Sequence, residues 1–90
     1  MNAPRISIIV LNWNGKDDTI ECIQSLFKIN YSNFDIIIVD NGSTDNSVEI
    51  FKKEFTKKIH IIETKKNLGY AGGNNFGIKY AIENLKERCL

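Results

Sequence analysis

The amino-acid sequence predicts one small α/β domain in which helices cover a parallel β-sheet, with elements in the order β-α-β-α-β-α. Two apolar runs, at residues 6–11 and 34–39, have the near-continuous pattern of strands that are buried on both faces. Segments with apolar residues at helical spacing follow these runs, and each strand run ends in a polar loop. Alternation of this kind indicates parallel strands joined by right-handed crossovers.

The composition excludes several functional classes. The 90 residues suffice for a single domain, and 42% hydrophobic with 26% charged residues is ordinary for a globular protein. A net charge of +1 offers no electrostatic basis for binding nucleic acid. No apolar run is long enough for a membrane span and no signal peptide is recognisable, so we expect a cytoplasmic protein with Cys22 and Cys89 as reduced thiols.

The first strand and helix are predicted at 6–11 and 16–28. Apolar residues recur at helical spacing from Ile20 to Phe27, and Asp17 and Asp18 precede them, where negative charge favours a helix start.

The second strand is predicted at 35–40, in the middle of the sheet, and the second helix begins near Asn46. Asn46 with Glu49 three residues later resembles a capping box, in which the first side chain caps the helix.

The third strand is predicted at 59–63, with the lone His60 as a strand residue, and the third helix at about 72–87. Four apolar residues of this helix are expected to face inward: Ile78, Ala81, Ile82 and Leu85. In the spatial order 3-2-1, three such strands form one mononucleotide-binding half of a three-layer, Rossmann-like parallel sheet.

Polar residues follow all three strands, and parallel strands bring them to one edge of the sheet. They are Trp13, Asp40, Asn41, Asn67, Gly72, Gly73, Asn74 and Asn75. An indole ring offers a stacking face for a base, and Asp or Asn can accept a hydrogen bond from an imide N–H. Glycines ahead of a helix would leave backbone amides for an anion. The alternative is that Asp40 and Asn41 only shape a turn and that Asp45 or Asn46 only caps a helix.

Several nucleotide-binding classes are excluded by the turn after the first strand. It reads Asn-Trp-Asn-Gly-Lys, which is neither the G-x-G-x-x-G motif nor a P-loop. A non-enzymatic flavodoxin-like or receiver-like binding module is the second interpretation. A receiver would need paired acidic residues after the first strand, where this chain has Asn12 and Asn14.

Three stretches in order, SIIVLNWNG at 7–15, VDNGSTD at 39–45 and NLGYAGGNNFG at 67–77, resemble a family 2 glycosyltransferase of the GT-A fold. The closest resemblance is to the rhamnosyltransferase-like branch of the family. This resemblance implies a role for the protein in cell-surface polysaccharide biosynthesis. The resemblance covers nearly all of the chain and implies that residues 1–90 form the amino-terminal, nucleotide-binding half of such a domain.

The resemblance implies a site for a nucleotide-diphospho-sugar, with UDP- and dTDP-sugars both open. Its residues would be Leu11, Asn12, Trp13, Asp40, Asn41, Asn67, Gly72 and Asn75. Leu11 and Trp13 would line the base, and Asp40 and Asn41 would be its polar contacts. The family commonly has a second Asp where this chain has Asn41.

The metal-binding Asp-x-Asp motif of the family follows a fourth strand, which we expect to lie beyond Leu90. The resemblance therefore implies that Mg²⁺ or Mn²⁺ binds ligands outside this chain and that the catalytic base also lies beyond Leu90, so the catalytic residues stay unassigned. Residues 1–90 alone are expected to be inactive, in an enzyme that is cytoplasmic or peripheral to the inner membrane face. The first strand would also have an open edge, and such edges favour self-association.

Overall fold

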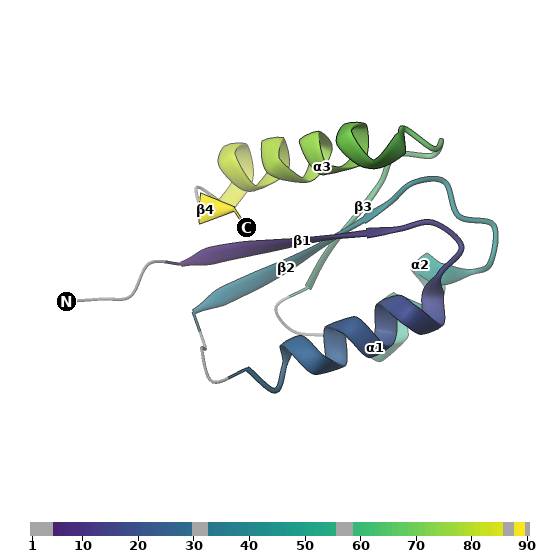
Figure 1. Ribbon diagram of the computed structural model, residues 1–90, viewed down its shortest axis with the longest axis horizontal. Helices are drawn as coiled ribbons and strands as arrows, with labels where there is room; N and C mark the ends of the chain where they lie inside the picture. The colour runs from purple at the N-terminus through teal and green to yellow at the C-terminus, as the bar shows by residue number, and fades with distance from the viewer. Residues whose placement is uncertain (1–4, 30–32, 56–58, 86–87, 90) are drawn as a thin grey trace.

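The structure, a computed structural model, describes residues 5–29, 33–55, 59–85 and 88–89. A four-stranded sheet in the order β3-β2-β1-β4 forms its middle layer (Figure 1), and every neighbouring pair of strands is parallel. The elements are β1 (Ile6–Asn12), α1 (Lys16–Leu26), β2 (Phe34–Asp40), α2 (Ser47–Glu54), β3 (Ile59–Glu63), α3 (Gly69–Tyr80), the π-helix η1 (Ala81–Leu85) and β4 (Arg88–Cys89). The predicted α/β class and the three predicted parallel strands are confirmed.

β2 forms the centre of the sheet, as its run of β-branched residues predicts. All seven of its residues are buried, and it pairs with β1 on one side and β3 on the other. In the register, Ile36 lies between Ile8 and Ile59. A parallel strand in this position is buried on both faces, so its pattern is continuous rather than alternating.

α1 and α2 cover one face of the sheet and α3 covers the other (Figure 1). Ile23 of α1 and Phe51 of α2 pack with the even-numbered β2 residues Ile36 and Ile38. On the opposite face, Val39 packs with residues at the end of α3 and the start of η1. The side chains of β2 therefore pack against helices on both faces of the sheet.

The predicted capping box at the start of α2 is wrong. Asn46 has a left-handed backbone with φ 63° and makes no capping hydrogen bond with its side chain. The carboxylate of Asp45 does this instead, because its Oδ1 accepts hydrogen bonds from the Ser47 backbone amide at 3.0 Å and from the Ser47 hydroxyl.

The predicted bounds of the third helix are also wrong, and of its predicted inner face Ala81 is confirmed as buried whereas Ile78 and Ile82 are not. α3 begins at Gly69, so Gly72 and Gly73 lie inside it rather than ahead of it, and from Ala81 the helix continues as a π-helix. Its buried residues are Gly73, Gly77 and Ala81, whereas Ile78 and Ile82 are exposed; the side chain of Leu85 and residues 86–87 lie outside the described part. Helix and sheet approach each other so closely here that only small residues fit between them.

A fourth strand lies within the chain, contrary to our expectation that it would follow Leu90. β4 pairs in parallel with the start of β1, through Ile6 with Arg88 and Ser7 with Cys89. Since β4 comprises two residues, it covers only the first part of the β1 edge.

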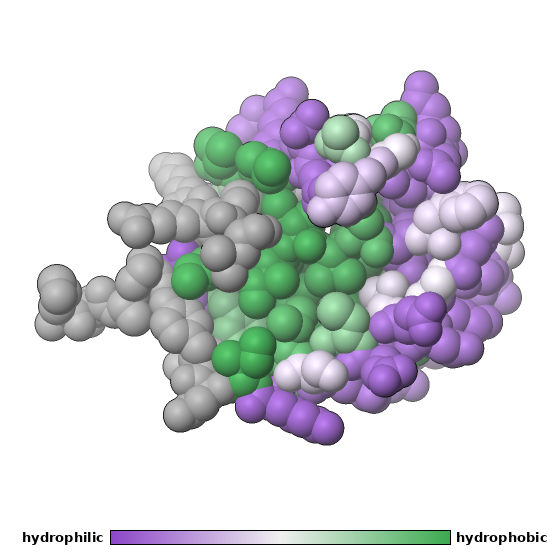
Figure 2. Space-filling view, in the orientation of Figure 1, coloured by the Kyte–Doolittle hydropathy of each residue, from purple (hydrophilic) through white to green (hydrophobic). Residues whose placement is uncertain are grey.

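The remaining β1 edge leads us to expect self-association. Within the described residues, no strand pairs with this side of β1 from Ile8 to Asn12. Apolar residues gather between α3 and α1 over this side of the molecule (Figure 2). Because an open edge presents unpaired backbone groups, light scattering should show an average mass that rises with concentration. A constant monomer mass at millimolar concentration would contradict this expectation.

Candidate nucleotide-sugar site

The carboxyl edge of the sheet gathers the loops that follow β1, β2 and β3. Backbone hydrogen bonds continue past the strands, from Asn41 N to Asn12 O and from Thr64 N to Asp40 O, both at 2.9 Å. The strand order places β2 and β3 on one side of β1 and β4 on the other, so the direction of winding reverses between β1 and β4. Ligands of open α/β sheets bind outside the carboxyl ends of strands at such a reversal.

Asp40 is the centre of a buried polar cluster at this edge. Asp40 is only 3% exposed. Oδ1 accepts from Asn12 Nδ2 at 2.9 Å and from Ser43 Oγ at 2.6 Å, and Oδ2 accepts from Ser43 N at 3.0 Å. These three hydrogen bonds hold the carboxylate between the ends of β1 and β2.

Asn12 and Asn14 tie the first loop to the second. Asn12 Oδ1 accepts from Thr19 Oγ1 of α1 at 2.7 Å. Asn14 N donates to Ser43 Oγ at 2.9 Å, and Asn14 Oδ1 accepts from Thr44 N at 2.7 Å. These reciprocal contacts make the two loops one rigid unit.

Asn41 lies on the α3 side of the sheet. Its Nδ2 donates to Gly69 O at 3.2 Å, and its Oδ1 lies 3.1 Å from Thr64 Oγ1. A Cβ added to Gly73 would lie 2.8 Å from Asn41 Nδ2 and 2.6 Å from Leu11 Cδ2. The amide thus holds the first turn of α3 beside Leu11. A carboxylate in its place would face the Gly69 carbonyl without a proton to donate.

The other predicted site residues are more dispersed. Trp13 is 56% exposed, so its ring is available for stacking. Asn67 Oδ1 accepts from Gly69 N at 2.8 Å and shapes the start of α3. Gly72 and Asn75 lie within α3, where Asn75 is exposed. The structure therefore groups Leu11, Asn12, Asp40 and Asn41 closely and places the rest around them.

Three cluster members were not among the predicted site residues: Thr19, Ser43 and Thr64. Ser43 stands in the quoted turn motif, so the sequence contained a signal for it. Thr19 and Thr64 carried none, because their roles depend on how α1 and β3 dock beside the turn.

Two polar hollows lie next to the Asp40 cluster. The larger, of about 340 Å³, is lined on the α2 side by residues that include Asp40, Ser43, Lys52 and Glu63. The smaller, of about 250 Å³, lies at the start of α1 and includes Asn14, Lys16 and Asp45. Only Asp40 of the predicted site residues lines either one, so we place the candidate site by strand order and loop geometry instead.

Asp45 has a shifted pKa. Burial acts to raise the pKa of its carboxyl, but hydrogen bonds from the Ser47 hydroxyl and from the backbone amides of Lys16 and Ser47 outweigh it, and the pKa lies below its ordinary value of 3.8. A carboxyl with a lowered folded-state pKa stabilises the fold above its unfolded pKa and loses that contribution as pH falls through the folded pKa.

We therefore expect Asp45→Ala to lower the free energy of unfolding at pH 7 by about 1 kcal/mol, the usual contribution of a helix cap. The difference from wild type should shrink below about pH 4, as the carboxyl becomes protonated. Urea unfolding at several pH values would measure it, with Asp18→Ala as the control because Asp18 is an exposed acid at the start of α1. A difference that does not change with pH would contradict the expectation.

The residues described do not form a site for the divalent metal that the family resemblance implies. Such cations take several oxygen ligands, usually carboxylates. Over residues 5–29, 33–55, 59–85 and 88–89, no three His, Cys, Asp or Glu side chains lie close enough together to hold a metal ion. Both oxygens of Asp40 already accept hydrogen bonds. We assign no step of a reaction to a metal in this chain.

Comparison with known proteins identifies the family. Residues 7–84 match the sequence model described as Glycosyl transferase family 2. The chain belongs to this family. This membership disfavours the flavodoxin-like or receiver-like alternative. Within the part of the chain that the structure describes, no helix is long and apolar enough to cross a membrane.

Several glycosyltransferases resemble the chain in sequence. An uncharacterized glycosyltransferase of Rickettsia conorii is 41% identical over 91% of this chain and 14% of its own length. An uncharacterized glycosyltransferase of Haemophilus influenzae is 34% identical over 86% of this chain and 24% of its own. A low-salt glycan biosynthesis hexosyltransferase of Haloferax volcanii is 34% identical over 94% of this chain and 25% of its own. The chain therefore spans a quarter or less of the length of these three relatives.

A solved structure supports the GT-A fold. A mannosyltransferase from Pyrobaculum calidifontis, in complex with GDP-Man and Mn²⁺, superposes with a TM-score of 0.78 at 21% identity. The superposition covers 90% of this chain and 25% of that protein. At this identity the similarity establishes the fold alone.

Proposed function

We propose that this chain provides the nucleotide-binding part of a glycosyltransferase, which transfers a sugar from a nucleotide-diphospho-sugar to an acceptor. The supporting observation is the rigid Asp40 cluster at the carboxyl edge of the sheet, beside the exposed ring of Trp13 and next to the winding reversal. Such an edge is where nucleotides bind in related α/β sheets.

In this proposal, Trp13 stacks on the base and Leu11 adds an apolar contact. Asp40 and Asn41 supply polar groups for the base, although both side chains also make internal hydrogen bonds. Asn12 orients Asp40, and Asn67, Gly72 and Asn75 lie toward the rest of the donor. The mannosyltransferase complex with GDP-Man supports a nucleotide-sugar as ligand.

The finer assignments are part of the same proposal. We propose a UDP- or dTDP-sugar as donor and a rhamnosyltransferase-like role in cell-surface polysaccharide biosynthesis. The Mn²⁺ in the mannosyltransferase complex supports a divalent metal in the complete enzyme. This chain's own residues would bind and orient the nucleotide.

Intrinsic fluorescence offers a direct test, because Trp13 is the single tryptophan of the sequence. Saturable quenching by UDP or dTDP is expected, with affinities confirmed by calorimetric titration. Trp13→Ala should weaken binding by roughly fivefold to a hundredfold, since stacking on a base contributes about 1–3 kcal/mol.

Titration with FMN and GDP serves as the comparison. Saturable binding of FMN in the absence of any binding of UDP, dTDP or GDP would overturn the proposed function. Preference for GDP would overturn only the assignment of the donor.

A further inference from the structure

α3 packs on the sheet mainly through small residues. A Cβ added to Gly77 would lie 2.7 Å from Ile9 Cγ2 and 3.1 Å from Val39 Cγ2. The backbone of the helix therefore packs directly against the side chains of β1 and β2. Ala81, one turn further, is fully buried, while the larger residues Phe76 and Ile82 are exposed. Glycine has no side chain to interlock with the strands, so the position of α3 depends on this close backbone approach and on the polar contacts of the helix.

Polar contacts hold α3 near both of its ends. At the end next to the candidate site, Asn41 Nδ2 donates to Gly69 O. At the other end, Tyr80 Oη lies 3.4 Å from His60 Nδ1 of β3, and the two rings are 5.8 Å apart between centroids. The small-residue face lies between these two contacts.

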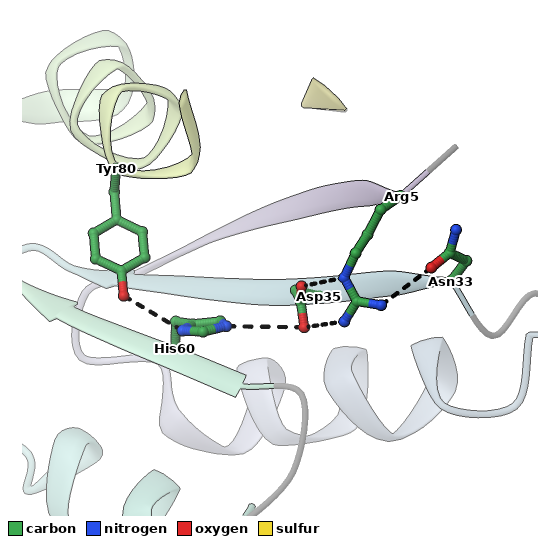
Figure 3. A network of polar contacts seen from close by, with 5 residues as sticks. All are labelled: Arg5, Asn33, Asp35, His60 and Tyr80. Carbon is green, nitrogen blue, oxygen red and sulfur yellow. Dashed lines mark hydrogen bonds and ion pairs between the residues drawn. The ribbon is translucent and has the colours of Figure 1, made fainter. Parts of the chain in front are cut away.

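The His60 end of this contact is anchored in the sheet (Figure 3). His60 Nε2 lies 3.8 Å from Oδ1 of the buried Asp35. Arg5 donates to both oxygens of Asp35 at 2.8 Å and to Asn33 Oδ1 at 3.1 Å. A guanidinium paired in this way fixes a carboxylate in direction as well as in place.

The row Arg5, Asp35, His60 and Tyr80 therefore runs from the lead-in of β1, across β2 and β3, to α3. In Figure 3, Tyr80 descends from the helix toward His60, and His60 lies between Tyr80 and Asp35. The row crosses the sheet close to where β4 joins β1 at Ile6 and Ser7. This is the end of the molecule opposite the Asp40 cluster.

We propose that His60 and Tyr80 are positioning residues for the nucleotide site. They fix the place of α3 along the sheet, and α3 in turn sets Gly69 and Gly73 against Asn41 and Leu11. This inference rests on the proposed function and adds to it two residues that touch neither base nor sugar. Loss of the Tyr80 hydroxyl lets the helix shift and loosens the site at its far end.

The test uses Tyr80→Phe, His60→Leu and the double variant. Affinity for UDP and dTDP is measured by calorimetry well below the melting temperature, and exchange of the Gly73 and Gly77 amides is followed by NMR without nucleotide. Each single variant should weaken binding by about twofold to fivefold, in the range of one hydrogen bond. Because both act through one contact, the double variant should lose little more than either single variant.

Two further variants separate positioning from general destabilisation. His60→Asn keeps a polar atom that can bond the Tyr80 hydroxyl near the Nδ1 position and should restore most of the affinity. Tyr70→Phe removes the same hydroxyl from a ring of α3 that is 80% exposed, and should leave amide exchange unchanged.

The outcomes distinguish this inference from the proposed function. Faster exchange with unchanged affinity would show a purely structural contact and overturn the inference, as would unchanged exchange in Tyr80→Phe. If the wild-type chain binds none of UDP, dTDP and GDP, the proposed function fails and the positioning role fails with it. The exchange rates of the Gly73 and Gly77 amides in Tyr80→Phe then still decide whether the contact between Tyr80 and His60 holds α3 in place.

Discussion

Asp40→Ala is expected to lower the free energy of unfolding by about 3 kcal/mol, because hydrogen bonds to a buried charged group contribute about 1.5–3 kcal/mol and their donors would remain unsatisfied. The donors are Asn12 Nδ2, Ser43 Oγ and Ser43 N. Asn12 is itself only 2% exposed, so water cannot easily replace the lost carboxylate. Urea unfolding followed by Trp13 fluorescence would measure the change.

The same variant tests the binding role of Asp40. If the carboxylate contacts the nucleotide as proposed, Asp40→Ala should also weaken UDP or dTDP binding roughly tenfold to a hundredfold. Asp40→Asn is the matched control, since it keeps the size and one oxygen acceptor for the internal bonds. A lowered stability with unchanged affinity for the nucleotide would reduce Asp40 to a turn-forming residue.

Gly42→Ala is expected to lower the free energy of unfolding by about 3 kcal/mol, through two effects that add. Gly42 has φ +81°, and a left-handed backbone costs a residue with a Cβ about 1–2 kcal/mol. An added Cβ would also lie 2.9 Å from Lys66 Cα and 3.0 Å from Lys66 N, where the backbone cannot rotate away. Forcing an atom into packed structure adds about 1–3 kcal/mol. Thermal or urea unfolding gives the total.

Gly69→Ala separates the two effects. Gly69 has a similar φ of +76°, but a Cβ there would meet nothing within 4 Å. We expect Gly69→Ala to lower the free energy of unfolding by about 1–2 kcal/mol, which is the cost of the left-handed backbone alone. Equal losses in Gly42→Ala and Gly69→Ala would mean that the loop after β3 yields to the added methyl group.

The central sheet could be predicted from sequence because its signal is local. The run of β-branched residues from Ile36 to Val39 can be buried on both faces only in a central strand, and the structure buries all of them. The polar turn that follows, including Asp40, was correctly placed at the carboxyl edge for the same reason. Strand order followed from the connections, which leave few arrangements for three consecutive βα units.

The start of α3 could not be predicted because its local signal opposes its structure. Glycine disfavours the helical state by about 1 kcal/mol relative to alanine, so the stretch that contains Gly69, Gly72 and Gly73 reads as a loop. The structure makes it helical because Gly73 allows the backbone to approach Leu11 and Asn41. Tertiary packing outweighs propensity here, and it also turns Ile78 and Ile82 outward.

The polar cluster was predicted in part. Asp40 and Asn41 were identified as candidate ligand contacts, and whether they contact a base stays a prediction. The threonine partners of the cluster could not be inferred, because Thr19 reaches Asn12 and Thr64 reaches Asn41 only after α1 and β3 have docked. The same applies to the cap of α2, where Asp45 and Asn46 were equally suitable by residue type and backbone geometry decided between them.

The place of β4 has a consequence for how the chain folds. β1 with β2, and β2 with β3, are separated in sequence by one helix each, whereas β4 must find β1 across almost the whole chain. Closing a longer loop loses more chain entropy before any contact forms. The three-strand unit should therefore assemble first, even while the chain is being synthesised, and β4 should dock last. Pulse-labelled hydrogen exchange should then protect β2 amides before those of β4, and simultaneous protection would argue against this order.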